Sequence, residues 1–143
     1  MKANSVAVAR AFVEAINRQD ADEIASLMAE DHVFIDSDGA AYRGKEQMHA
    51  GWKQYFTMFP DYSITVEETY SRGPVVVMVG RAEGTYAVDG KLLDENHWRV
   101  PAVWRAVLRN QTVLEWRVYV NVEPILKVMS QRRQGPAGER ATR

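Results

Sequence analysis

Ala29-Glu30-Asp31-His32-Val33-Phe34-Ile35-Asp36-Ser37-Asp38-Gly39 follows two predicted helices and contains a short apolar strand at residues 32–36. Ser37-Asp38-Gly39 is a turn signal that ends this strand. Asp36 therefore stands at the strand end, shortly before a long aromatic helix. A carboxylate at the mouth of an apolar pocket can act as a base near neutral pH, which predicts a catalytic role for Asp36. The alternative is that Asp36 only caps the turn, a common use of aspartate.

The composition is that of one soluble globular domain. The chain has 143 residues, of which 46% are hydrophobic and 26% charged, enough to bury a core. It contains no cysteine, which excludes disulfides, thiolate metal sites and a cysteine nucleophile. We find no signal peptide and no apolar run of membrane-spanning length. We therefore expect a cytoplasmic protein that does not enter membranes.

The net charge of −1 is unevenly distributed. Residues 131–143 hold four arginines against one glutamate, a local +3 that leaves the rest of the chain at −4. A body of that sign does not suit nucleic acid, so we expect no nucleic-acid partner. The composition predicts one folded domain over residues 1–130 and a disordered basic tail over residues 131–143.

Three helices are predicted in the first sixty residues. The first covers residues 5–18, with Val8, Phe12 and Ile16 on one apolar face. Asp20 caps a second, shorter helix. The third runs from about residue 44 to residue 60 and carries an aromatic stripe. The stripe consists of Met48, Trp52, Tyr55, Phe56 and Phe59.

From residue 62 the apolar period changes to two, which predicts strands. Four antiparallel strands are expected at residues 62–70, 75–86, 92–109 and 112–121, with turns at residues 72–74, at Asp89-Gly90 and at residues 110–111 between them. Pro101 marks a bulge or an edge, and Pro124 begins a last short helix. The order predicts an α+β fold in which three N-terminal helices cover one face of a strongly curved antiparallel sheet.

Four segments carry a family signal: Phe12-Val13-Glu14-Ala15-Ile16-Asn17 with Asp20, residues 29–39, Phe59-Pro60-Asp61, and Leu114-Glu115-Trp116-Arg117-Val118-Tyr119. On these residues the chain resembles the nuclear transport factor 2-like superfamily, in its SnoaL-like and ketosteroid isomerase-like branch. The resemblance spans about residues 5–130 and implies a cone-shaped, cystatin-like α+β barrel. This fold hosts isomerases, epoxide hydrolases, polyketide cyclases, dehydratases and non-enzymatic adaptors.

The resemblance assigns roles one residue at a time. Asp36 matches the general base of ketosteroid isomerases, whereas Phe12 and Ala102 replace the tyrosine and the protonated aspartic acid of their oxyanion hole. Val100, Ala102 and Val118 replace the Asp-Arg-Asp set of limonene epoxide hydrolase-like enzymes, which excludes that chemistry. Ala102 also replaces the histidine of SnoaL-type cyclases, and Asn121 stands where their acid lies.

These observations predict an apolar pocket under the aromatic helix for a small hydrophobic carbonyl-type molecule. A stripe of this kind more often belongs to a packed core than to a binding site, and in this fold it can serve both. His97 is a second catalytic candidate if its strand turns it inward, and otherwise an exposed strand histidine. We place Val100, Ala102 and Trp104 inward. The predicted binding residues are Phe12, Ile16, Phe34, Trp52, Tyr55, Phe56, Phe59, Trp98, Ala102, Trp104, Val118, Tyr119 and Asn121.

The three histidines, His32, His49 and His97, show no metal-ligand spacing, and the sequence has no phosphate loop or Gly-x-Ser-x-Gly motif. We therefore expect no metal and no cofactor. The predicted function is proton transfer by Asp36 in an isomerisation, cyclisation or dehydration. The alternative is a ligand-binding or interaction module without chemistry. Apolar residues on both sides of residues 75–79 predict a homodimer through the outer sheet face.

Overall fold

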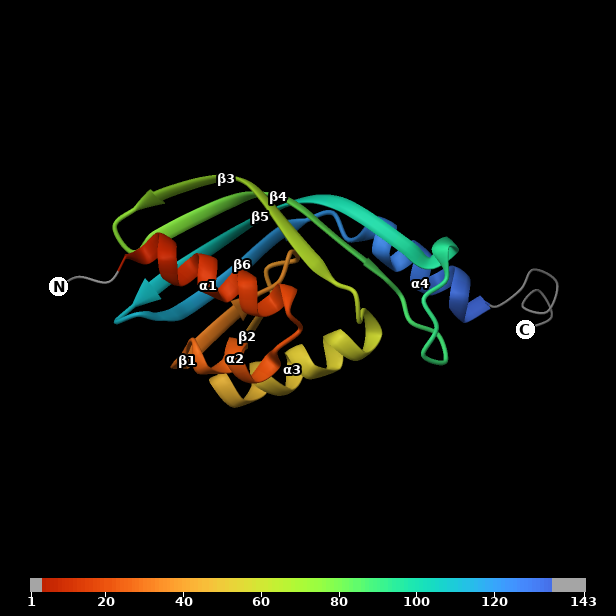
Figure 1. Cartoon of the computed structure of the whole chain (residues 1–143), viewed down its shortest axis with the longest axis horizontal. Coiled ribbons are helices and arrows are strands. Elements are labelled where there is room, and N and C mark those ends of the chain that lie inside the picture. The colour runs from red at the N-terminus through yellow and green to blue at the C-terminus, as the bar shows by residue number, and fades with distance from the viewer. Residues whose placement is uncertain (1–3, 135–143) are drawn as a thin grey trace.

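The computed structural model of the protein describes residues 4–134, which form a curved six-stranded sheet, four α-helices and one short 3-10 helix (Figure 1). The fold is α+β, as the sequence predicts. The helices are α1 Ser5–Asn17, α2 Ala21–Ser26, α3 Lys45–Met58 and α4 Glu123–Gln134, with the 3-10 helix η1 at Asp94–Asn96. The strands are β1 Met28–Ile35, β2 Ala41–Arg43, β3 Ser63–Arg72, β4 Val75–Thr85, β5 His97–Arg109 and β6 Thr112–Val120.

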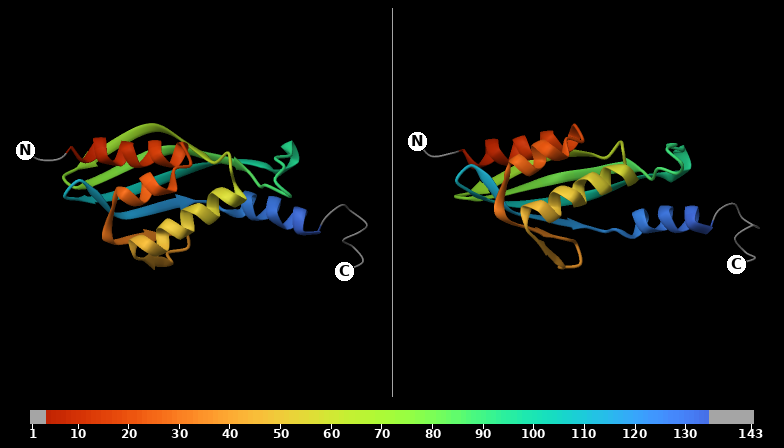
Figure 2. Two further views of the ribbon diagram at one scale, coloured as in Figure 1. Left: turned by 60° about the horizontal axis from the view of Figure 1, so that its bottom comes forward. Right: turned by 90° about the horizontal axis from the view of Figure 1, so that it is seen from below.

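Helices α1, α2 and α3 lie on one face of the sheet, which confirms the predicted arrangement (Figures 1 and 2). Side chains cap the N-termini of the first two helices. Asn4 accepts a hydrogen bond from the Ala7 amide, and Asp20 accepts one from the Glu23 amide. The predicted apolar face of α1 is buried, with Phe12 fully shielded from solvent. Burial of this face, rather than helix propensity, holds α1 on the sheet.

The strand order is β2-β1-β6-β5-β4-β3, and within residues 4–134 the sheet stays open, with β2 and β3 at its edges. Every neighbouring pair is antiparallel except β1 and β6, which run parallel. The four strands predicted as antiparallel, β3 to β6, are confirmed, and the parallel pair joins β1 to this set. The chain between β1 and β6 contains the helix α3 and the four strands β2 to β5, the long connection that parallel neighbours require.

Strand β1 begins at Met28, four residues before the predicted start. The pairing with β6 shifts register between Met28 and Val33, and the two residues Glu30 and Asp31 inside this irregularity are both exposed. Because of this interruption, buried and exposed residues do not alternate at the start of β1, so the sequence pattern does not indicate its first residues. The sequence analysis also missed β2, which has three exposed residues and hence no apolar period.

The long strand β5 starts at His97 rather than residue 92, because η1 occupies the preceding residues. Pro101 lies one position beyond the last β5–β6 partner, Ala102, so its missing N–H faces the side where β6 has ended. Pro101 is therefore at a local edge, as predicted, and the β5 irregularity falls at Val107 instead. On β4, a Cβ at Gly80 would lie 1.8 Å from the Thr65 carbonyl oxygen, so only glycine fits the tight approach of the two strands.

Helix α4 extends away from the sheet at the end opposite the N-terminus (Figure 2). It reaches Gln134, four residues into the segment predicted as a tail, and residues 135–143 lie outside the described residues. In the described part of the chain, no helix has the length and apolar character needed to cross a membrane.

Candidate functional site

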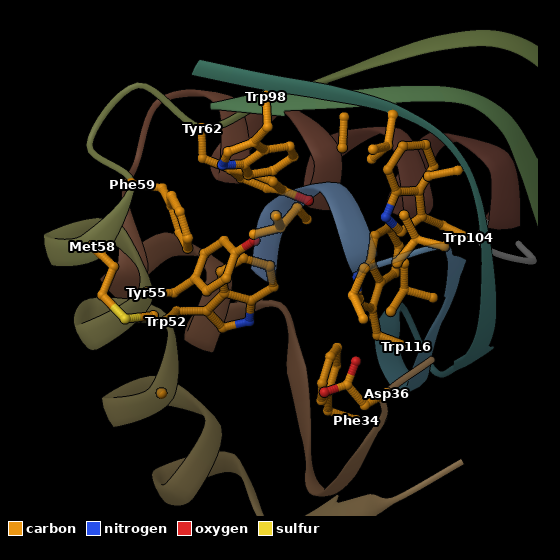
Figure 3. Close-up of a pocket in the computed structure, with 18 of the residues that line it drawn as sticks. Phe34, Asp36, Trp52, Tyr55, Met58, Phe59, Tyr62, Trp98, Trp104 and Trp116 are labelled. Carbon is orange, nitrogen blue, oxygen red and sulfur yellow. The ribbon is translucent and has the colours of Figure 1, made fainter. Parts of the chain in front are cut away.

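A cavity of about 320 Å³ lies between α3, the inner face of β4, β5 and β6, and the first turns of α4. Figure 3 shows aromatic rings on opposite sides of it, with Tyr62 and Trp98 at one end and Phe34 with Asp36 at the other. All four tryptophans of the chain line this cavity. They are Trp52, Trp98, Trp104 and Trp116.

Strand alternation directs the sheet side chains into the cavity. Along β5, buried and exposed residues alternate, and the buried set Trp98, Val100, Ala102 and Trp104 faces inward. This matches the predicted orientation of Val100, Ala102 and Trp104. Ala102 and the neighbouring Ala82 on β4 leave space that larger side chains would fill. These two alanines stand between larger rings on the sheet and opposite the rings of α3, and a cavity remains in place of a packed core.

The rings on α3 and after it support one another. Tyr55 is central: its ring centroid lies 4.9 Å from that of Phe59, 5.0 Å from that of Tyr62 and 6.0 Å from that of Trp52. The Phe59 ring in turn meets the Trp98 ring edge to face at 5.4 Å. Such contacts stabilise aromatic pairs beyond simple burial. This wall of the cavity is therefore well ordered by its own contacts.

Asp36 lines the cavity and directly follows Ile35, the last residue of β1. Its Oδ1 accepts the Ser37 amide at 2.7 Å, and its backbone pairs with Ala40 and Gly39 across the turn. The turn and the cavity therefore use the same residue. Within residues 4–134 the second carboxylate oxygen accepts no hydrogen bond from the protein, which leaves it available to a bound molecule.

Two tyrosine hydroxyls also face the cavity (Figure 3). Burial raises the pKa of Tyr55, and the neighbouring Tyr62 and the charge of Asp36 raise it further. Burial alone raises the pKa of Tyr62. Both groups therefore stay protonated at neutral pH and remain hydrogen-bond donors.

Two indole nitrogens of the cavity are unpaired. Trp52 is 7% exposed and Trp98 is 3% exposed, and among residues 4–134 neither Nε1 has a hydrogen-bond partner. Buried donors of this kind usually find an acceptor.

Eight of the thirteen predicted binding residues line the cavity, and five do not. Phe12 and Ile16 lie under α1 in the packed core, and the Phe12 ring is 4.7 Å from the Trp116 ring. Phe56 packs beside Trp52 but outside the cavity lining. The eight that line it are Phe34, Trp52, Tyr55, Phe59, Trp98, Ala102, Trp104 and Val118.

Tyr119 and Asn121 belong to the surface. The Tyr119 ring is 44% exposed and lies beneath the Arg117 guanidinium at 4.8 Å, because alternation along β6 turns Val118 inward and Tyr119 outward. Asn121 accepts the Glu123 amide at the start of α4. Asn121 therefore does not supply an acid-like group to the cavity.

His97 does not enter the cavity, so the prediction that it is catalytic there is wrong. Its neighbour Trp98 takes the inward position on β5, which places His97 on the other face. The imidazole Nδ1 lies 2.9 Å from the Thr85 hydroxyl, and Nε2 lies 3.2 Å from the Glu83 carboxylate. Among residues 4–134, no group of three or more histidine, aspartate or glutamate side chains is arranged to hold a metal.

The sequence analysis missed several lining residues. Tyr62 and Trp116 are buried apolar positions beside predicted strands, and alternation would have found Trp116 once β6 was placed. Met48 belongs to the predicted aromatic stripe and lines the cavity, but it is not among the predicted binding residues. The remaining contacts depend on where α4 lies, which has no signal in the sequence. They include Val122, Ile125, Leu126 and Met129.

Comparisons with known proteins agree on the fold. Residues 9–116 match the model of the SnoaL-like domain family. A Shewanella denitrificans structure, provisionally assigned as a SnoaL-like polyketide cyclase, is 18% identical with a TM-score of 0.76 over 89% of this chain and 98% of that one. A provisionally assigned SnoaL-like polyketide cyclase from Jannaschia is 24% identical, with a TM-score of 0.72 over 88% and 89% of the two chains.

A third structure, from Catenulispora acidiphila, has a ketosteroid isomerase-like fold and was solved in complex with trimethylamine. It is 18% identical, with a TM-score of 0.73 over 86% of this chain and 92% of that one. At these identities the likeness concerns the fold. No sequence relative was found among curated proteins.

Proposed function

The chain belongs to the SnoaL-like domain family, and from that premise we propose that it binds a small hydrophobic carbonyl compound in this cavity and moves a proton with Asp36. The observation that carries the proposal is a carboxylate with a free oxygen at the edge of an otherwise aromatic and aliphatic cavity. Asp36 is the one described lining residue whose side chain can accept a proton as a carboxylate.

The proposed step begins with the carbonyl oxygen of the substrate directed toward α3. The unliganded oxygen of Asp36 takes a proton from the carbon next to the carbonyl. The C–H bonding pair moves to form an enolate, whose oxygen receives hydrogen bonds from the Tyr55 and Tyr62 hydroxyls. Asp36 then returns the proton to a different carbon in an isomerisation. In a cyclisation the enolate carbon attacks a second carbonyl, whose π pair moves to its oxygen, and Asp36 gives its proton to that alkoxide.

The tyrosines matter to this proposal because the donors of the related isomerases are replaced by Phe12 and Ala102. An enolate without donors would forfeit the largest electrostatic contribution to such catalysis. A tyrosine hydroxyl is protonated at neutral pH, and both hydroxyls face the cavity (Figure 3), so each can donate to an oxygen of a bound molecule.

Deuterium exchange tests the proposal without knowledge of the natural substrate. 2-Tetralone, a hydrophobic ketone with acidic α-hydrogens, is incubated with the protein in D₂O and followed by NMR. We expect the protein to accelerate exchange, and Asp36→Asn to remove the acceleration while the melting temperature stays within a few degrees. Asp38→Asn is the matched control, since that neighbouring carboxylate is exposed and lies outside the cavity.

Equal acceleration by wild type and Asp36→Asn would contradict the assignment of the base. Binding of the ketone without exchange in either protein would favour the alternative function, a ligand-binding module without chemistry.

We also propose a homodimer through the outer face of β4 and β5, where Val77 and Val79 are only half-buried. Light scattering that reports a monomer at micromolar concentration would remove this proposal. The cytoplasmic location stays a prediction.

A further inference from the structure

The charge distribution around the cavity is one-sided. Asp36 is the only charged side chain among the described residues that line it. Arginines of the same strands sit on the outer face instead, where Arg81 pairs with Glu67 and Arg105 pairs with Glu115. The interior thus presents one negative group and no positive one from residues 4–134.

Aromatic rings add to this field. The face of an aromatic ring carries the negative part of its quadrupole, and indole attracts cations more strongly than the other rings do. Trp52, Tyr55 and Phe59 line one side of the cavity, and Trp104 and Trp116 line the opposite side (Figure 3). A ligand in the middle lies between ring systems that favour positive charge.

Asp36 also needs a partner when the cavity is filled. Within residues 4–134 it forms no ion pair. A neutral ligand would strip water from this carboxylate and give it nothing in return, which is costly. A cationic ligand would compensate the charge that it desolvates.

We propose that the natural ligand of this cavity carries a tertiary or quaternary ammonium group, held by the aromatic rings and by Asp36. The inference rests on the proposed function for the place of binding and names the class of substrate: an apolar amine-bearing carbonyl compound. A positive charge near the carbonyl also stabilises the enolate that proton removal creates. The same substrate feature would therefore serve both binding and the chemical step.

The test uses two probes of one shape. Phenyltrimethylammonium and tert-butylbenzene differ in a charged nitrogen against a neutral carbon. Binding is followed by tryptophan fluorescence, which reports on this site because every tryptophan lines it. We expect the cation to bind roughly fivefold tighter or more, although water solvates it better. Equal or tighter binding of tert-butylbenzene, or no binding of the cation, would overturn the proposal.

Three variants separate the contributions of Asp36 and of the aromatic rings. Asp36→Asn should weaken binding of the cation and leave the affinity for tert-butylbenzene unchanged. Trp52→Leu should weaken binding of the cation, whereas Trp52→Phe, which keeps a ring, should retain part of it. Loss of affinity for both probes in equal proportion in all three variants would count against a cation site.

The outcome is separable from that of the proposed function. Exchange of 2-tetralone without preference for the cation would leave the proton-transfer proposal intact and reject the ammonium class. Preference for the cation without exchange would support the ammonium class and reject the catalysis.

Discussion

The inner face of the sheet has two ends that are built from the same strands but differ in how they are packed. Under α1 the face is filled: Phe12, Ile16, Ala106 and Val113 are all fully buried. Under α3 and α4 the face is hollow, with a cavity of about 320 Å³. Trp116 separates them, because its ring contacts Phe12 on one side and lines the cavity on the other.

The difference shows that apolar residues alone do not decide whether a region is core or pocket. Aliphatic side chains on α1 interdigitate with the sheet at the filled end. At the hollow end, the rings of α3 brace one another and stand opposite small side chains such as Ala82 and Ala102. Rigid rings held by ring contacts cannot collapse into the remaining space, so a cavity persists.

Truncation at the filled end should have the largest effect on stability. Phe12→Ala removes a fully buried ring from between α1 and Trp116. We expect the free energy of unfolding to fall by about 3–5 kcal/mol, since the surrounding side chains cannot fill the space. Urea denaturation followed by circular dichroism measures this. A loss below about 1 kcal/mol would mean that the two ends do not differ in packing.

A matched pair on β6 sharpens the comparison. Val113 is fully buried at the filled end, whereas Val118 is half-buried and borders the cavity. We expect Val113→Ala to cost about 2 kcal/mol, from two methyl groups and a new void, and Val118→Ala to cost about 1 kcal/mol or less. Both losses come from the same denaturation measurement. Costs that are equal within error would refute the distinction.

The filled end also contains a buried titratable group, His32. Its Nδ1 donates to the Val113 carbonyl at 2.7 Å, and burial lowers its pKa, against smaller opposing effects of that hydrogen bond and of Glu115. In the unfolded chain His32 therefore takes up a proton near pH 6.5, whereas in the folded protein it does so only at a lower pH. His32 thus reduces stability as the pH falls below 6.5, until the lower folded pKa is reached.

His32→Asn tests this linkage, because asparagine can still donate to Val113 but does not titrate. We expect the free energy of unfolding of the wild type to fall, relative to the variant, by up to ~1.4 kcal/mol per pH unit below pH 6.5. Denaturation at pH 7 and pH 5 measures the difference. Parallel pH profiles of the two proteins would show that His32 takes no part.

The smallest effect is expected on the outer face, which belongs to neither end. Tyr119→Ser removes an exposed ring and its contact with Arg117. We expect a change of about 0.5 kcal/mol or less in unfolding free energy and no change in binding of the ammonium probe. A weakened probe affinity would mean that the cavity extends beyond its described lining.

The sequence was sufficient for the order of elements because long amphipathic segments and tight turns have local signals. Two adjacent residues suffice to indicate a tight turn. Examples are Asp89-Gly90, where both residues have positive φ, and Asn110-Gln111. β2 was not predicted because its three residues are all exposed and therefore show no apolar alternation. The parallel pairing of β1 escaped because pairing direction depends on the path of the chain between the strands.

The site was predictable wherever a single strand or helix decides which way a side chain points. Alternation on β5 was enough for Ala102 and Trp104, and helical spacing on α3 was enough for Trp52 and Tyr55. Phe12 was misplaced because the apolar spacing of a helix that packs in the core does not differ from that of a helix that lines a pocket. Only its contacts with the sheet distinguish the filled end from the hollow one.

The parallel neighbours β1 and β6 carry a consequence for how the chain folds. His32 and Val113, which hydrogen-bond across this pair, are 81 positions apart. During synthesis β1 can therefore pair only with the short strand β2 until β6, the last strand, has been made. Contacts of such sequence separation slow folding. A chain cut before β6 would expose β1 as an unpaired edge, a ready template for misassembly.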